Sequence, residues 1–144
     1  MRTQQTIIIC VVVLIVAVAF AAVSITSVEA AKPRPDLAPT ITGTTVVYNY
    51  GSNGSIMSGN VTVTVRVSNI GNRAAGASTL SVNLGAGTQT ASIGSLAAGA
   101  SQSASVTFSN LARFTYTVTA TADSTSAVSE SNENNNVATT SVTV

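Results

Sequence analysis

The sequence contains no histidine and no tryptophan, and its single cysteine, Cys10, lies in an apolar run near the N-terminus. Residues 31–144 therefore contain no cysteine, and no disulfide within them can stabilise the fold. A serine or threonine nucleophile would lack its usual histidine base, and the only lysine is Lys32. None of the common nucleophile–base pairs is available, and we predict that the protein is not an enzyme.

Charged residues are also scarce, with 6 Lys or Arg and 5 Asp or Glu, for a formal net charge of +1. Nucleic-acid-binding proteins usually have a basic stripe, whereas the arginines after residue 36 (Arg66, Arg73 and Arg113) are widely spaced. We therefore expect no nucleic-acid partner and no electrostatic capture of a polyanion.

Residues 1–30 have the features of a secretory signal sequence. Arg2 precedes an apolar run over residues 7–23, and the sequence Val-Glu-Ala at residues 28–30 places small side chains at the two positions that signal peptidase inspects. We predict a hydrophobic helix here, removed by cleavage after residue 30. Retention as a membrane anchor over residues 7–25 is the alternative, because hydropathy alone does not separate the two. In either case the rest of the chain is delivered outside the cytoplasm.

After a short, proline-containing linker at residues 31–35, the dominant sequence period is two. In residues 61–67 four valines alternate with Thr, Thr and Arg, which is typical of a half-buried strand. Glycine and asparagine residues suited to turns separate such runs. Strands are expected at 37–42, 44–49, 61–69, 78–84, 88–93, 102–109 and 114–122, and a last one near 137–144 would bring the total to eight.

Short strands at this spacing predict an all-β fold, namely an immunoglobulin-like or fibronectin-like antiparallel β-sandwich of about seven strands. Phe108, Phe114 and Tyr116 alternate with polar residues and are expected in its core. In the turn that follows residue 68, we expect Gly71 to adopt a positive φ and Asn69 to hydrogen-bond the turn backbone.

Several short motifs occur in an order that resembles a known family. They are Asp36-Leu37, Gly59 before the run at 61–67, Asn69-x-Gly71, Ala75-Gly76, the stretch 96–101 (Leu-Ala-Ala-Gly-Ala-Ser), Tyr116-Thr117-Val118 running into Ala122-Asp123, and the stretch 128–135 (Val-Ser-Glu-Ser-Asn-Glu-Asn-Asn). Over residues 36–144 the chain resembles the CARDB domain, a cell-adhesion-related domain of exported bacterial and archaeal proteins. The resemblance implies an immunoglobulin-like sandwich at the cell surface, often repeated within large proteins. Here a single copy without a catalytic domain favours a stand-alone or self-assembling role.

One polar cluster is a candidate metal site. It consists of Asp123, Glu130, Asn132, Glu133 and Asn135. Oxygen ligands on a loop between two strands suit calcium, although their spacing does not match an EF-hand loop. The simpler interpretation is that these side chains cap backbone groups of the loop.

Other candidate residues lie near the middle of the chain. Tyr48 and Tyr50 belong to a less regular segment and are candidates for an exposed contact surface. Asn53 and Asn60 each begin an Asn-x-Ser/Thr sequence in or beside an expected turn, and they are candidate glycosylation sites if the host glycosylates surface proteins.

Export, the predicted sandwich and the family resemblance together favour a cell-surface or secreted, non-catalytic binding or adhesion module. Its partner would be a cell-surface protein, a carbohydrate or another copy of the chain, and it would meet a membrane only through an uncleaved N-terminal segment. The alternative is a self-assembling structural subunit of an extracellular filament or surface layer, because a sandwich with few charges has little to block edge-to-edge strand pairing.

Overall fold

The computed structural model describes residues 32–144, and every regular element in that range is a β-strand. The strands are β1 (Leu37–Tyr50), β2 (Ile56–Asn69), β3 (Ser78–Asn83), β4 (Thr88–Ile93), β5 (Ser101–Leu111), β6 (Thr115–Thr121) and β7 (Val137–Thr143). The predicted N-terminal helix lies outside the described residues. Within residues 32–144 the structure has no helix that is long and apolar enough to cross a membrane.

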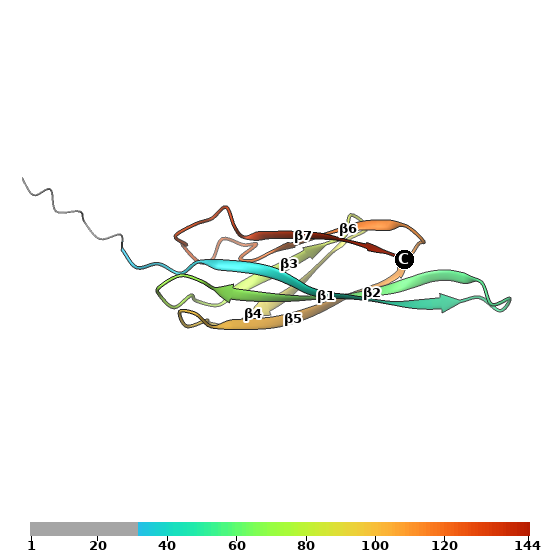
Figure 1. Ribbon diagram of the computed structural model, residues 1–144, viewed down its shortest axis with the longest axis horizontal. Coiled ribbons are helices and arrows are strands. Elements are labelled where there is room, and N and C mark those ends of the chain that lie inside the picture. The colour runs from blue at the N-terminus through green and yellow to red at the C-terminus, as the bar shows by residue number, and fades with distance from the viewer. Residues whose placement is uncertain (1–31) are drawn as a thin grey trace, which may run out of the picture. The chain divides into compact units, whose positions relative to one another are not determined.

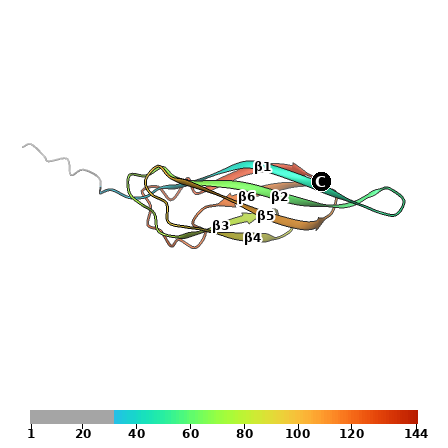
Figure 2. The ribbon, with the colours of Figure 1, turned by 90° about the horizontal axis from the view of Figure 1, so that it is seen from below.

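The strands form two sheets packed face to face, as Figures 1 and 2 show from two directions. One sheet has the order β1-β2-β5, and the other has the order β4-β3-β6-β7. All neighbouring strands run antiparallel. The predicted immunoglobulin-like β-sandwich of about seven strands is therefore confirmed.

The core between the sheets follows directly from the alternating sequence pattern. The four valines of β2 (Val61, Val63, Val65 and Val67) are fully buried, while the residues between them are exposed or half-buried. They share one apolar cluster with side chains of the other sheet, such as Val82 of β3. Burying a valine side chain stabilises a fold by roughly 1.5–3 kcal/mol, so this row is a major part of what holds the sandwich together.

The two strands predicted at 37–42 and 44–49 are a single strand, β1, which corrects the expected strand count. The register against β2 shifts between Ile41, which pairs with Val65, and Gly43, which pairs with Thr64. Thr42 is thus the extra residue of a β-bulge, and the side chains that point inward change from odd to even positions there. This change of phase made one strand look like two in the sequence.

The aromatic residues predicted in the core divide into two groups. Phe108 is confirmed as a core residue, and Tyr116 packs partly buried against the core. The prediction for Phe114 was wrong, because 67% of its surface is exposed. Phe114 precedes the first residue of β6, and its ring packs edge-on against Tyr116 with centroids 5.6 Å apart. Alternation indicates the side of the sheet to which a residue points, but not whether the opposing sheet extends that far.

Candidate functional site

One end of the sandwich is organised around Asn69, the last residue of β2, whose side chain is fully buried. Its Oδ1 accepts hydrogen bonds from the backbone N–H groups of Asp36 and Gly71, each at 3.1 Å. Its Nδ2 donates to three carbonyl oxygens, those of Arg73 (2.7 Å), Leu96 (3.0 Å) and Ala97 (3.3 Å). The predicted bonding of Asn69 to the turn backbone is confirmed, and the same side chain also fixes the start of β1 and the loop before β5.

Gly71 is required at this end for a different reason from the predicted one. Positive-φ glycines occur at Gly54, Gly85 and Gly99, and Gly71 is not among them. A Cβ atom on Gly71 would instead lie 2.5 Å from the carbonyl oxygen of Arg34 and 2.6 Å from the carbonyl carbon of Pro35. Gly71 therefore allows close approach of two backbone segments rather than a left-handed turn.

The loop between β6 and β7 contains the sequence-predicted acidic cluster, and its carboxylates bind backbone N–H groups. Asp123 is buried with φ of 42°, and its two oxygens accept hydrogen bonds from Ala127 N (3.0 Å) and Val128 N (2.9 Å). Glu133 Oε1 accepts from the backbone N–H of Glu130 at 2.9 Å. The Asn136 amide is oriented so that its Nδ2 donates to the carbonyl oxygen of Leu37 (2.6 Å) and to Glu130 Oε2 (3.3 Å). Asn132 Oδ1 accepts from Asn134 N at 3.1 Å.

Glu130 and Asp36 join this loop to the start of β1. The Glu130 carboxylate is 3% exposed and accepts a 2.5 Å hydrogen bond from Leu37 N. Asp36, which the sequence interpretation did not include in the cluster, accepts from Ser131 Oγ at 3.2 Å and from Asn135 Nδ2 at 2.7 Å. Its place in the motif Asp36-Leu37 was the only signal in the sequence, because the partners lie more than 90 residues away.

This arrangement has the geometry of loop capping. The oxygens of Asp123 and Asp36 and one oxygen of Glu133 already face donors of the protein itself, whereas Asn135 Oδ1 is buried and accepts no hydrogen bond from the described residues. In the part of the chain that the structure describes, no three Asp, Glu, His or Cys side chains form a group suited to a metal ion. Calcium binding by the loop stays a prediction.

Burial raises the pKa of the Glu130 carboxyl above its ordinary value of 4.5, and the nearby carboxylates of Glu133, Asp123 and Asp36 raise it further, against the opposing effect of the Leu37 N–H. The folded state then binds a proton more tightly than the unfolded state does. We expect Glu130 to stabilise the fold fully below pH 4.5 and to lose that contribution as pH rises through its raised pKa. Glu130→Gln should flatten this part of the pH profile of the unfolding free energy, as measured by denaturant titration.

Glu133→Gln is the comparison variant, because it removes a more exposed carboxyl whose charge raises the Glu130 pKa less than burial does, so it should flatten the profile less than Glu130→Gln. If it flattened the profile as much as Glu130→Gln, the assignment to Glu130 would be wrong. Repeating the titrations with calcium and with a chelator tests the metal prediction as well. A ligand that binds only the folded state raises its stability, so a calcium-independent profile would count against a site in this loop.

The opposite end of the sandwich contains Tyr48 and Tyr50, on a β1–β2 hairpin that extends beyond the neighbouring strand. The pairing of β2 with β5 ends where Gly59 meets Leu111, while β1 and β2 continue to the pair Tyr50–Ile56. Figures 1 and 2 both show this hairpin protruding past the other strands. Tyr48 and Tyr50 are 38% and 64% exposed, so the predicted exposure is present, and a contact role stays a prediction.

The two candidate glycosylation sites lie in different surroundings. Asn53 is exposed in the hairpin turn, where its Oδ1 accepts from Ser55 N at 3.1 Å. Asn60 lies within β2 rather than beside a turn, and its Oδ1 accepts from Asn110 N at 2.9 Å. Asn53 is thus the more accessible of the two, and modification of either stays a prediction.

Comparison with known proteins gives a consistent picture of the fold. The CARDB family model matches residues 34–140. A crystal structure of a CARDB domain from Pyrococcus furiosus, in complex with di-metal ions, is 24% identical with a TM-score of 0.59, and the match covers 78% of this chain and 96% of that one. A solution structure of the same Pyrococcus furiosus domain is also 24% identical, with a TM-score of 0.57 and coverage of 78% and 97%.

A third similar structure is a domain, residues 272–376, of a presumed cell-surface protein from Methanosarcina acetivorans. It is 25% identical with a TM-score of 0.54, and the match covers 77% of this chain and 92% of that one. No curated protein is significantly similar in sequence.

Proposed function

Since the chain belongs to the CARDB family, we propose that it is an exported, non-catalytic binding or adhesion module that acts at the cell surface or outside the cell. The Methanosarcina acetivorans relative, a domain of a presumed cell-surface protein, supports this setting. The signal sequence predicted in residues 1–30 supports export. Its partner would be a protein or a carbohydrate of a cell surface.

The observation that carries the proposal is the apolar surface of the β1–β2 hairpin. Four of its side chains are exposed although they are apolar or aromatic, namely Val47 (60%), Tyr48 (38%), Tyr50 (64%) and Met57 (67%). Residues 37–65 contain no charged side chain. A concentration of exposed apolar residues on one protrusion is typical of an interaction surface, and tyrosine supplies both apolar contact and a hydrogen-bonding group.

The fold itself gives no reason for Tyr50 and Met57, at the tip of the hairpin, to be apolar. At Gly59 the hairpin still contacts the other sheet, because Val144 packs against this position and leaves no room for a Cβ. Beyond Gly59, β2 has no β5 partner and the ribbon has only two strands. Polar side chains would serve equally well there if the hairpin had no partner.

We expect Tyr48→Ser combined with Tyr50→Ser to weaken binding of the fluorescently labelled chain to intact cells of the producing species by about tenfold or more, because aromatic residues dominate most binding surfaces. Flow cytometry over a range of concentrations gives the apparent affinity. Tyr50 is 64% exposed and Tyr48 is 38% exposed, so we expect only a modest fall in the melting temperature.

Phe114→Ser is the control, because Phe114 is an aromatic residue outside the hairpin that is about as exposed as Tyr50. Unchanged binding of the tyrosine variant, or equal losses in both variants, would contradict a contact surface on the hairpin.

Self-assembly is the second candidate, and the edges of the four-stranded sheet favour it. Its edge strands β4 (TQTASI) and β7 (VATTSVT) contain neither proline nor a charged residue, which are the features that commonly protect exposed edges. Light scattering over a wide concentration range separates the two functions. A mass that rises with concentration favours a filament or surface-layer subunit, and a constant monomer mass favours the binding module.

The Pyrococcus furiosus domain was crystallised in complex with di-metal ions, so we also considered a metal in this chain. Both oxygens of Asp123 and one oxygen of Glu133 accept from backbone N–H groups, and within the described part of the chain Asn135 Oδ1 is the one candidate oxygen that is buried without a donor, so the loop as folded offers fewer free oxygens than a calcium ion takes. We propose instead that the acidic loop is structural and joins the β6–β7 connection to the start of β1.

A further inference from the structure

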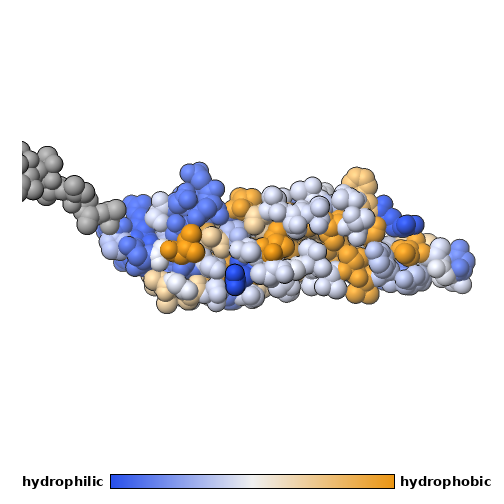
Figure 3. All heavy atoms as spheres, in the orientation of Figure 1, coloured by the Kyte–Doolittle hydropathy of each residue, from blue (hydrophilic) through white to orange (hydrophobic). Residues whose placement is uncertain are grey.

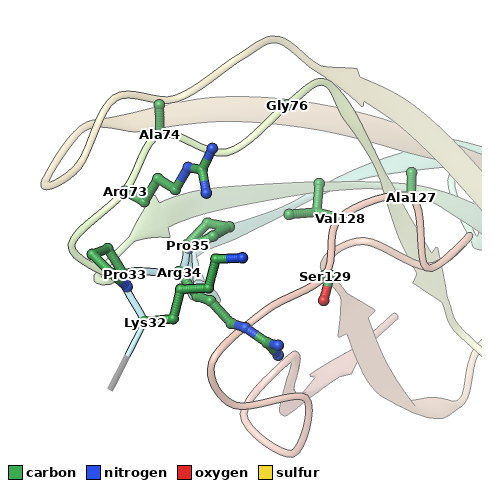
Figure 4. A pocket seen from close by; sticks show the side chains of 10 residues that line it. All are labelled: Lys32, Pro33, Arg34, Pro35, Arg73, Ala74, Gly76, Ala127, Val128 and Ser129. Atoms are coloured by element: carbon green, nitrogen blue, oxygen red, sulfur yellow. The ribbon is translucent and has the colours of Figure 1, made fainter. Parts of the chain in front are cut away.

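A pocket of ≈ 430 Å³ lies at the end of the sandwich remote from the hairpin, beside the start of β1. Its lining residues are Lys32, Pro33, Arg34, Pro35, Arg73, Ala74, Gly76, Ala127, Val128 and Ser129. Figure 4 shows the side chains of Lys32 and Arg73 extending toward the same opening from two different segments, with the Arg34 guanidinium on the far side of Lys32 from Arg73. In Figure 3 the strongly hydrophilic surface gathers at this end of the domain.

The charge of this pocket is one-sided. Residues 32–144 contain five cationic side chains, of which Lys32, Arg34 and Arg73 line the pocket, and no carboxylate lines it. Within the described chain, the only hydrogen bond that these three cationic groups make is a long one, from Arg34 Nη1 to the carbonyl oxygen of Glu130 at 3.5 Å. Most of their hydrogen-bonding capacity therefore remains for a ligand.

The backbone that carries the two arginines is held in place by the Asn69 side chain and its neighbours. Asn72 N donates to the Arg34 carbonyl oxygen at 3.2 Å, and Asn72 Oδ1 accepts from Arg34 N at 3.0 Å. Asn69 Nδ2 binds the carbonyl oxygen of Arg73 at 2.7 Å. These contacts use only the backbone groups of the two arginines, so their side chains remain available for a ligand. Because the backbone is already fixed, less backbone entropy is lost when a ligand binds.

The lining also indicates the class of ligand. Val128 is the largest apolar side chain in it, and there is no aromatic residue, so the pocket lacks the deep anchoring site that peptide recognition usually needs. For the same reason, the pocket has no aromatic side chain on which a nucleic-acid base could stack. Arginine pairs with carboxylate or sulfate oxygens through two parallel hydrogen bonds, and Ser129 offers a hydroxyl for a sugar hydroxyl.

We propose that this pocket binds an acidic saccharide, with Arg73 and Lys32 on its carboxylate or sulfate group and Arg34 adding positive charge. The site takes one or two anionic sugar residues and is not a polyanion-binding stripe. It lies at the other end of β1 from the hairpin, so the two binding surfaces can be tested separately.

The test uses the full-length protein purified from its expression host, whether or not that host removes the N-terminal segment. The probe is trigalacturonic acid at low ionic strength. We expect calorimetry to detect binding that weakens with added salt, because salt screens exposed charges. Arg34→Gln with Arg73→Gln should lower the affinity about tenfold or more, as expected when charge-assisted hydrogen bonds are lost. Arg66→Gln with Arg113→Gln removes the same charge outside the pocket and should leave the affinity nearly unchanged.

Three outcomes would overturn the proposal. Equal losses in both double variants would mean that only net charge matters. Equal affinity for the fully methyl-esterified trisaccharide would exclude the carboxylate as the recognised group. Equal or tighter binding of triglutamate would point to an acidic peptide instead. Unchanged melting temperatures in both double variants ensure that a loss of affinity reflects the pocket and not unfolding. Because calorimetry measures saccharide binding directly, the result does not depend on whether the hairpin binds cells.

Discussion

Replacing Gly71 with alanine is expected to lower the free energy of unfolding by about 3 kcal/mol or more, which is the upper range for forcing an extra atom into a packed site. The added Cβ would lie 2.5 Å from the Arg34 carbonyl oxygen and 2.7 Å from Asp36 N. Both are backbone atoms, and a rotamer change cannot move them away. The clash would be relieved only by separating the 69–73 turn from the start of β1.

Gly76→Ala is the matched control, because a Cβ there would meet nothing within 4 Å and its φ is not in the left-handed region. We expect this variant to be neutral or to gain about 0.4–1 kcal/mol through the lower entropy of its unfolded chain. Urea-induced unfolding followed by circular dichroism measures both. Similar unfolding midpoints for the two variants would show that the close approach at Gly71 does not limit stability.

The example of Gly71 also indicates how far the sequence alone can lead. Its pattern with Asn69 predicted a structural turn, and this is correct, but the expected positive φ is wrong. Glycine serves two purposes, left-handed backbone and close approach, and local sequence does not distinguish them. The segment that approaches Gly71 is residues 34–36, which lie far away in the sequence.

The fold was predictable because each strand has one buried face, which a period of two records directly. The errors occur where burial depends on something beyond the strand itself. The bulge at Thr42 interrupts the alternation, so the sequence pattern predicted two strands where the structure has one. Phe114 has the inward phase of β6 but lies before the strand begins, where its ring stays exposed.

The basic pocket shows the same limitation for function. Lys32 and Arg34 fall in the segment predicted as a linker, and Arg73 was counted among widely spaced arginines. Hydrogen bonds between residues 38 positions apart bring the two arginine-bearing segments together. Charge spacing along the chain therefore predicted the absence of a basic stripe but could not predict a local pocket built from two segments.

Asn69→Asp is expected to be strongly destabilising, with a loss of about 3 kcal/mol or more, because each buried polar group left without a partner costs about 1–3 kcal/mol. The change keeps the acceptor that binds Asp36 N and Gly71 N. It removes the amide that donates to the carbonyl oxygens of Arg73, Leu96 and Ala97, and it places a carboxylate against them.

The control is Asn83→Asp, which makes the same chemical change at an exposed turn, where Oδ1 accepts from Gly85 N and Nδ2 donates to Thr88 Oγ1. We expect a change within about 0.5 kcal/mol there, as for most surface substitutions. Chemical denaturation at several pH values gives a further check on Asn69→Asp. A protonated carboxyl can donate one hydrogen bond, so its deficit should shrink as pH falls.

If Asn69→Asp lost no more stability than Asn83→Asp, the contacts of Asn69 Nδ2 would be unimportant, and the loops would be held by apolar packing alone. If instead the loss is large and shrinks at low pH, the buried amide donor joins these segments. In that case the expected loss extends to function, because the Asn69 contacts also hold the backbone of Arg73. Saccharide binding should then fall in this variant even at temperatures where it remains folded.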